Sequence, residues 1–203
     1  MNIHNPFACK LLVIEGPDMS GKATQSKMLV NALSQLGYRA ERIEVPTRYA
    51  PRTHKLIYWM LNNGLAKRFP NAFQIIQFFN KFFFQLFWLP KIMRVNDYIV
   101  FDRWRLSSVI YGLVTHVNEK LVMFLYNKLR RADITFIMHG KSHRRNPMND
   151  DSYEKDTELQ ASVKTLYHAW AMSTKDHVLV PNVGIKGEVH MRIVEALSNR
   201  RLI

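Results

Sequence analysis

Short apolar runs alternate with longer segments of helical periodicity along this chain. Five runs have the length of buried strands: Lys10–Ile14, Tyr38–Val45, Tyr98–Phe101, Ile134–Met138 and Val178–Val180. Periodic apolar positions between them predict seven helices: Lys22–Leu36, His54–Asn62, Asn71–Leu89, Leu106–Val114, Glu119–Arg130, Ser152–Ala171 and Lys186–Ser198. This alternation predicts an α/β fold, with a mostly parallel sheet that carries helices on both faces.

Length and composition predict one globular domain over residues 1–203, of which 47% are hydrophobic. The single cysteine, Cys9, excludes an internal disulfide and favours a reducing compartment. The first residues lack the features of a signal peptide, so we expect a cytoplasmic protein. The Phe-rich segment Phe69–Leu89 repeats polar side chains at Gln74, Gln77, Lys81 and Gln85. This pattern indicates a helix with one polar face, which either packs in an aromatic-rich core or faces the substrate, and not a membrane span.

The chain is strongly basic, with a formal net charge of +13. The charge is uneven, because no Asp or Glu occurs from Val45 to Asn96, whereas Arg and Lys recur throughout that segment. An acid-free basic segment of this length favours an anionic partner, although chance clustering in a basic protein is an equal alternative.

A glycine-rich segment follows the first predicted strand and opens the first helix. It reads Gly16-Pro17-Asp18-Met19-Ser20-Gly21-Lys22, which is the spacing of the Walker A motif. Its backbone N–H groups and the helix N-terminus can hold phosphates, and the lysine can reach the β- and γ-phosphates. The motif therefore predicts an ATP-binding fold of the P-loop NTPase type. The predicted nucleotide contacts are Gly16, Pro17, Asp18, Met19, Ser20, Gly21, Lys22, Ala23 and Thr24.

Three polar segments follow predicted strands, where parallel sheets bind ligands: the glycine-rich loop, Pro46–Arg48 and Asp102-Arg103. We expect them to meet in one cleft. Asp102 is placed to hold Mg²⁺ or to cap the following helix. A Ser or Thr hydroxyl usually follows the motif lysine and binds Mg²⁺, but this chain has Ala23, so we expect Thr24 or water to take that position.

These segments together resemble the thymidylate kinase family. The resemblance runs from Leu11 to about Trp170. The matching segments are Gly16–Thr24, Val45–Arg48, Asp102–Tyr111 with Ser107 four residues after Arg103, and Tyr153-Glu154 followed by Leu159-Gln160. It implies a kinase that uses ATP and Mg²⁺, the metal being held through Asp102 and Thr24.

The resemblance also implies which residues surround the phosphate acceptor. Asp18 would contact its sugar, Arg48 and Arg103 its phosphate, and Phe78 would stack on its base unless it packs in the core. The full predicted set is Asp18, Arg48, Phe78, Arg103, Ser107, Tyr111 and Tyr153. Some members carry a catalytic arginine in the glycine-rich loop, where this chain has Met19. The catalytic set would then be Lys22, Asp102 and the arginines Arg144 and Arg145 of a mobile lid at about residues 141–152.

Two positions depart from the family pattern around the base. The base-reading arginine falls on Phe82, with Lys81 as the nearest basic residue, and a small alanine is replaced by Ile110. We therefore expect base recognition to differ from that of an ordinary thymidylate kinase. Family members are often dimers, so a homodimer is also an option.

Three functions are compatible with these patterns. The favoured one is a viral-type kinase that phosphorylates 5-hydroxymethyluracil within DNA, a step in thymidine modification, because the acid-free basic segment lies on the acceptor side. Such an enzyme would act in the host cytoplasm. The alternative is a kinase that converts free dTMP to dTDP. A non-catalytic nucleotide or DNA binder is the third, and only Ala23 supports it.

Overall fold

The computed structural model describes residues 9–140, 153, 155–173 and 176–203. Five strands form one parallel sheet in the order β2-β3-β1-β4-β5. The strands are β1 Lys10–Glu15, β2 Ala40–Glu44, β3 Tyr98–Asp102, β4 Ile134–Gly140 and β5 His177–Asn182. The predicted α/β class and parallel sheet are confirmed.

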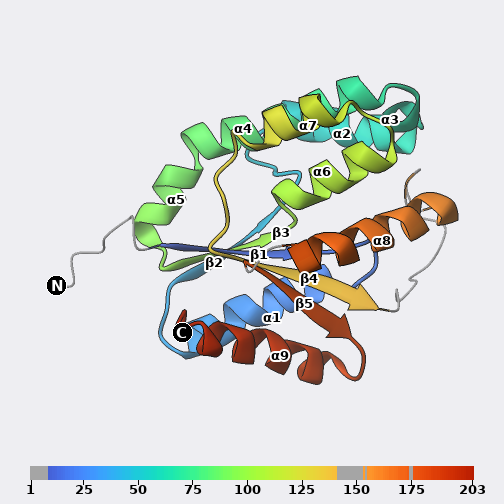
Figure 1. Cartoon of the computed structure of the whole chain (residues 1–203). Helices are drawn as coiled ribbons and strands as arrows, with labels where there is room; N and C mark the ends of the chain where they lie inside the picture. The colour runs from blue at the N-terminus through green and yellow to red at the C-terminus, as the bar shows by residue number, and fades with distance from the viewer. Residues whose placement is uncertain (1–8, 141–152, 154, 174–175) are drawn as a thin grey trace.

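Nine helices lie in the described part of the chain. They are α1 Lys22–Gln35, α2 Pro51–Asn62, α3 Leu65–Arg68, α4 Pro70–Phe87, α5 Leu89–Val95, α6 Arg105–Val114, α7 Glu119–Tyr126, α8 Thr157–Ser173 and α9 Lys186–Asn199. Figure 1 shows α1 and α9 on one face of the sheet and the other helices on the opposite side. No helix among the described residues has the length and apolarity needed to cross a bilayer.

Alternation along the central strand β1 divides the core between the two faces. Leu12 and Ile14 pack with residues of α1 and α9, whereas Leu11 and Val13 pack with residues of α4 to α7. Successive side chains of a strand point to opposite faces, so burial on both sides explains why β1 is apolar without interruption until Glu15.

The sheet order brings the candidate site residues together. β1 lies between β3 and β4, with Ile14 opposite Asp102 and also opposite Phe136. The loop after β1 therefore emerges beside the end of β3. Because all strands are parallel, the ends of β2 and β3 open at the same edge.

Several predicted boundaries differ from the structure. The predicted helix Asn71–Leu89 ends at Phe87, and a separate helix, α5, starts at Leu89 with Pro90 in its first turn. Proline has no N–H and blocks helix continuation, so the break follows from the sequence. The short α3 was not predicted, and it starts after Gly64 in the left-handed conformation. The predicted lid at residues 141–152 lies outside the described residues.

Candidate active site

The glycine-rich loop joins β1 to α1 and closely approaches β4. A Cβ added at Gly16 would lie 2.8 Å from the Met138 carbonyl oxygen, and the residue has a φ of +143°. Only glycine fits that position without strain. Gly21 also has a positive φ and directly precedes α1, so the loop delivers Lys22 to the helix N-terminus.

Lys22 is buried, and loop atoms provide its hydrogen-bond acceptors. Its Nζ donates to the Pro17 carbonyl at 2.5 Å and lies 3.4 Å from Ser20 Oγ. Burial, followed by the nearby positive charge of Arg103, lowers the pKa of Lys22 to about 7. Phosphate oxygens would be far stronger acceptors for this ammonium group, which fits a triphosphate site.

Asp18 stands at the centre of a polar network between the loop and α6. Its carboxylate forms an ion pair with Arg103 and accepts hydrogen bonds from Tyr111 at 2.5 Å and Gln160 at 2.9 Å. Burial alone would raise the pKa of Asp18, but Arg103, Lys22 and the hydrogen bonds outweigh it and lower the pKa. The Tyr111 ring stacks on Tyr153 with 5.7 Å between centroids.

Glu15 fixes the start of α6 against β1. This fully buried carboxylate accepts from the Trp104 N–H at 2.8 Å, the Ser107 N–H at 3.2 Å and the Tyr167 hydroxyl at 3.1 Å. It also accepts from the Ser107 hydroxyl. Glu15 therefore positions Ser107, one of the predicted acceptor residues.

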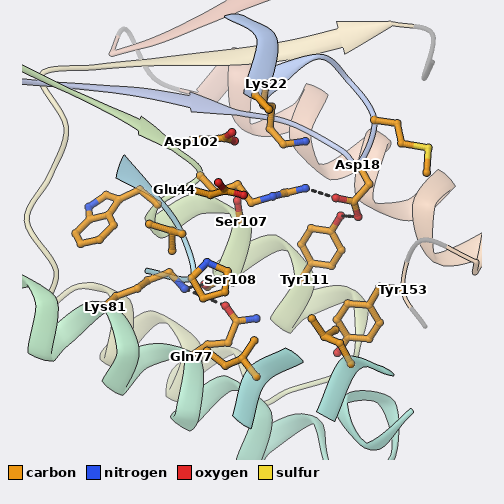
Figure 2. Close-up of a pocket in the computed structure, with 18 of the residues that line it drawn as sticks. Asp18, Lys22, Glu44, Gln77, Lys81, Asp102, Ser107, Ser108, Tyr111 and Tyr153 are labelled. Carbon is orange, nitrogen blue, oxygen red and sulfur yellow. Dashed lines mark hydrogen bonds and ion pairs between the residues drawn. The ribbon is translucent and has the colours of Figure 1, made fainter. Parts of the chain in front are cut away.

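One cavity of about 930 Å³ connects the loop with the inner face of α4. Figure 2 shows Lys22 and Asp102 on one side of this cavity and Gln77 and Lys81 on the other. Tyr111 and Tyr153 lie side by side along the wall between the two ends. The cavity is large enough for a small ligand with a polar group at each end.

The end of the cavity at α4 is a buried polar cluster, which we call the Lys81 cluster: Gln77, Lys81 and Ser108. Lys81 Nζ donates to Gln77 Oε1 at 3.0 Å and to Ser108 Oγ at 2.6 Å. Among the described residues, no carboxylate forms an ion pair with Lys81. Burial lowers its pKa to about 7, Glu15 acts in the opposite direction, and Arg103 adds to the lowering.

Phe78 and Phe82 do not line this cavity. Phe78 is 7% exposed and packs within the core, where it stacks on Phe82 and meets Tyr126 edge-on. Of the two roles considered for Phe78, the structure therefore shows core packing and not stacking on a ligand in the cavity. The residues that face the cavity are Gln77, one position before Phe78, and Lys81, the basic residue that the sequence placed nearest to the family's base-reading position.

The other predicted residues divide into three groups. The predicted residues that line the cavity are Asp18, Met19, Gly21, Lys22, Ala23, Thr24, Asp102, Arg103, Ser107, Tyr111 and Tyr153. Gly16, Pro17 and Ser20 belong to the phosphate loop but not to the lining, and Arg48 is exposed and also outside the lining. Arg144 and Arg145 lie outside the described residues. The N-cap of α6 is Trp104, so Asp102 does not cap that helix.

Asp102 pairs with a residue that the sequence did not suggest. Its Oδ2 accepts from Arg42 Nη2 at 2.5 Å. Ala23, which lines the same cavity, has no hydroxyl, and within the described residues no three His, Cys, Asp or Glu side chains gather as a metal site. The loop thus suits ATP phosphates, whereas of the two predicted Mg²⁺ ligands Asp102 is already bound by Arg42.

Five residues of the site were missed or given no role by the sequence: Glu15, Arg42, Gln77, Lys81 and Ser108. Glu15 could have been found from the sequence, because a carboxylate at the end of a buried apolar strand is costly unless it accepts hydrogen bonds from buried donors. Arg42 had none, since its contact with Asp102 depends on the pairing of β2 with β3.

Comparisons with known proteins agree with this geometry. The family model described as thymidylate kinase matches residues 14–193. A thymidylate kinase homologue from Invertebrate iridescent virus 6 is 27% identical over 161 residues, which is 77% of this chain and 73% of the relative. Human thymidylate kinase is 53% identical over 38 residues, 19% of this chain and 18% of its own length.

Solved structures share the fold. Thymidylate kinase from Candida albicans matches with a TM-score of 0.76 and 23% identity over 95% of this chain and 92% of that one. The enzyme from Ehrlichia chaffeensis has a TM-score of 0.73 and 20% identity over 94% of this chain and 98% of that one. The family model covers most of the chain. This chain therefore belongs to the thymidylate kinase family and is a phosphotransferase.

Proposed function

We propose that the protein transfers the γ-phosphoryl group of ATP to a free deoxynucleoside monophosphate with a thymine-like base. The single observation that carries this proposal is the cavity that joins the phosphate loop to the Lys81 cluster. The two polar ends of a mononucleotide correspond to the two polar ends of this cavity. Its phosphate can lie near Lys22 and Arg103 while its base reaches the inner face of α4. The favoured acceptor thus differs from the DNA-embedded base that the charge pattern suggested.

The loop end of the cavity suits phosphoryl transfer. Lys22 is buried and Arg103 is half-buried, and each can donate to phosphate oxygens as negative charge develops on them. Their hydrogen bonds are strong in an enclosed cavity of low polarity. Asp18 holds Arg103 in place and offers a carboxylate that a sugar hydroxyl can reach by displacing Gln160.

The Lys81 cluster suits a base that carries keto oxygens. An ammonium group donates hydrogen bonds and accepts none, so Lys81 favours a carbonyl oxygen over an amino group. The Gln77 amide and the Ser108 hydroxyl can serve as donor or acceptor for the rest of the base edge. Thymine and uracil present such oxygens, whereas the exocyclic amine of cytosine would meet a like donor.

A second candidate acceptor is 5-hydroxymethyluracil within DNA. It is supported by the basic side chains on the loop after β2 and on the first turns of α2, where Arg48, Arg52 and Lys55 are all exposed. Ile57 and Tyr58 of the same helix line the cavity. A polyanion that reached the cavity would pass these cations.

The experiment that distinguishes the candidates uses γ-labelled ATP with dTMP, dUMP, dCMP or duplex DNA that contains 5-hydroxymethyluracil. We expect label on dTMP and dUMP, little on dCMP and none on DNA. Lys22→Met serves as the inactive control, and Lys81→Met should lose the preference for dTMP over dCMP. Label on the DNA alone would contradict the proposal and favour the second candidate.

A further inference from the structure

Asp102 ends β3 beside the phosphate loop, where an acidic side chain would ordinarily serve a metal ion. Here the carboxylate is 5% exposed, and its Oδ2 is bound by Arg42 at 2.5 Å. The contact joins neighbouring strands, because Glu44 of β2 lies opposite Asp102 of β3. Arg42 lies two residues earlier on β2 and projects to the face of the sheet that α1 covers.

The Arg42 guanidinium is held from several sides. Its Nε donates to Ser26 Oγ of α1 at 2.7 Å, and its Nη1 lies 3.4 Å from the Glu44 carboxylate. Ser26 is itself fixed, since its hydroxyl donates to the Ala23 carbonyl at 3.2 Å. A guanidinium that is bound by a buried carboxylate and by a second element is fixed in place, and breaking such a pair would leave a buried charge unpaired.

Two features of this chain therefore reduce the number of side-chain oxygens that could bind a metal ion beside the phosphate loop. Ala23 offers no hydroxyl at the first turn of α1, and Asp102 already holds a cation. A divalent ion on Asp102 would lie next to the Arg42 guanidinium at a few ångströms, and like charges at that distance repel strongly in a partly buried site. Lys22 and Arg103 add further positive charge, because both interact electrostatically with Asp102.

We propose that Arg42 is the resident cation of Asp102, so that the protein itself adds little to the binding of the Mg²⁺ that accompanies the nucleotide. Arg42 supplies a fixed positive charge beside the phosphate loop, and Asp102 acts as its anchor. This inference rests on the proposed function, because it assumes that nucleotide phosphates bind beside Lys22.

The test measures metal affinity without turnover. Mn²⁺ is titrated into protein with ADP, and free Mn²⁺ is counted by electron paramagnetic resonance. We expect the wild-type protein to tighten Mn²⁺ binding less than about threefold relative to ADP alone, and Arg42→Met to tighten it about tenfold or more because Asp102 is released. Arg39→Met is the matched control, since Arg39 also pairs with an aspartate, Asp97, away from the loop.

A second variant keeps the test valid if Arg42→Met does not fold. Ala23→Ser restores the missing hydroxyl on the wild-type background, and with Asp102 committed to Arg42 it should tighten Mn²⁺ binding less than about threefold. Wild-type protein that tightens Mn²⁺ binding tenfold, or Arg42→Met that behaves like Arg39→Met, would overturn the inference. Calorimetry of ADP binding in EDTA separates the two proposals, because a protein that does not bind ADP would overturn the proposed function as well.

Discussion

At the scale of single residues, Glu15 has the largest set of buried hydrogen bonds in the site. Four donors, from Trp104, Ser107 and Tyr167, converge on its two oxygens. Glu15→Gln would place an N–H₂ group against one or more of these donors, and an unsatisfied buried donor costs about 1–3 kcal/mol.

We therefore expect Glu15→Gln to lower the free energy of unfolding by about 1–3 kcal/mol and to lower the turnover number through displacement of Ser107. Urea unfolding measures the first effect and steady-state kinetics the second. Tyr167→Phe is the control, because it removes one donor and leaves the carboxylate intact. Equal stability of Glu15→Gln and wild type would contradict this role for Glu15.

Lys81 gives a prediction about pH. Its pKa in the folded protein is about 7, whereas an unfolded lysine titrates near 10.4, so between these values the unfolded chain holds a proton that the folded protein has released. Stability therefore rises with pH in this window, by on the order of 1 kcal/mol per pH unit.

Lys81→Met should accordingly show a smaller rise in unfolding free energy than wild type from about pH 7 to about pH 8.5. The pKa of Lys22 is lowered as well, and Lys22 remains in the variant. The slope of unfolding free energy against pH should therefore fall by about half. Urea unfolding across this range measures it, with the exposed Lys91→Met as the control. Parallel slopes for Lys81→Met and wild type would contradict a depressed pKa at this position.

The sequence predicted the residues of the phosphate loop better than those of the base end, because only the loop is built from contiguous residues. The phosphate loop was readable because its function depends on contiguous spacing. At the base end the predicted stacking residue was Phe78, one position after Gln77. A helix turns by about 100° per residue, so a shift of one position moves a side chain from the cavity to the core. Arg42 needed the strand pairing, which no local pattern contains.

At the scale of elements, α4 is unusual because it buries polar residues beside phenylalanines and exposes three other phenylalanines to solvent. Gln74, Asn80 and Lys81 are buried, whereas Phe79, Phe83 and Phe87 are 41%, 42% and 60% exposed. These three rings repeat every four residues and stack in sequence along one face of the helix. We call them the α4 phenylalanine row.

The α4 phenylalanine row supports the expectation of a homodimer. Three rings of about 150–250 Å² each expose on the order of 300 Å² at these fractions. Leu86 and Trp88 beside them are 49% and 41% exposed. A stable interface needs about 800 Å² per partner, so this row could form the apolar centre of a two-fold contact.

We expect Phe83→Lys to convert a dimer into a monomer, because each copy would place a charge in the apolar centre of the other. Sedimentation velocity measures the change, and Phe124→Lys on α7 is the matched control for an exposed phenylalanine elsewhere. A wild-type protein that sediments as a monomer at all accessible concentrations would contradict the dimer.

The elements themselves were largely predictable. All five strands and most helices follow from hydrophobic periodicity, and the helix break before α5 follows from Pro90. The periodicity of α4 gave the helix and left two orientations open, of which the structure shows the one that turns Gln77 and Lys81 toward the cavity. The polar side chains that face the cavity are therefore an exception to the usual relation between polarity and exposure.

At the scale of the whole molecule, the net charge of +13 predicts affinity for nucleic acid whether or not DNA is a substrate. Arg52 and Lys55 on α2 are exposed near the cavity, and Lys91 and Arg94 on α5 are exposed at another part of the helical layer. Figure 1 shows α2 and α5 well separated.

Arg52→Ser combined with Lys55→Ser should reduce the slope of log binding constant against log salt by up to about 2 if these cations contact phosphates. Fluorescence anisotropy with a labelled duplex measures the slope. Lys91→Ser with Arg94→Ser removes the same charge from α5, so an equal effect of both pairs would indicate nonspecific attraction by the whole surface.

The buried Lys81 ammonium has a consequence for chemical probes. A lysine with a pKa of about 7 is partly unprotonated at neutral pH, and the neutral amine is a nucleophile. A nucleoside that carries an aldehyde on the edge of its base would place that group against Lys81 and form a Schiff base with it. A Lys81→Arg variant carries a guanidinium in place of the amine and would not react in this way, so it would show whether the label sits on Lys81.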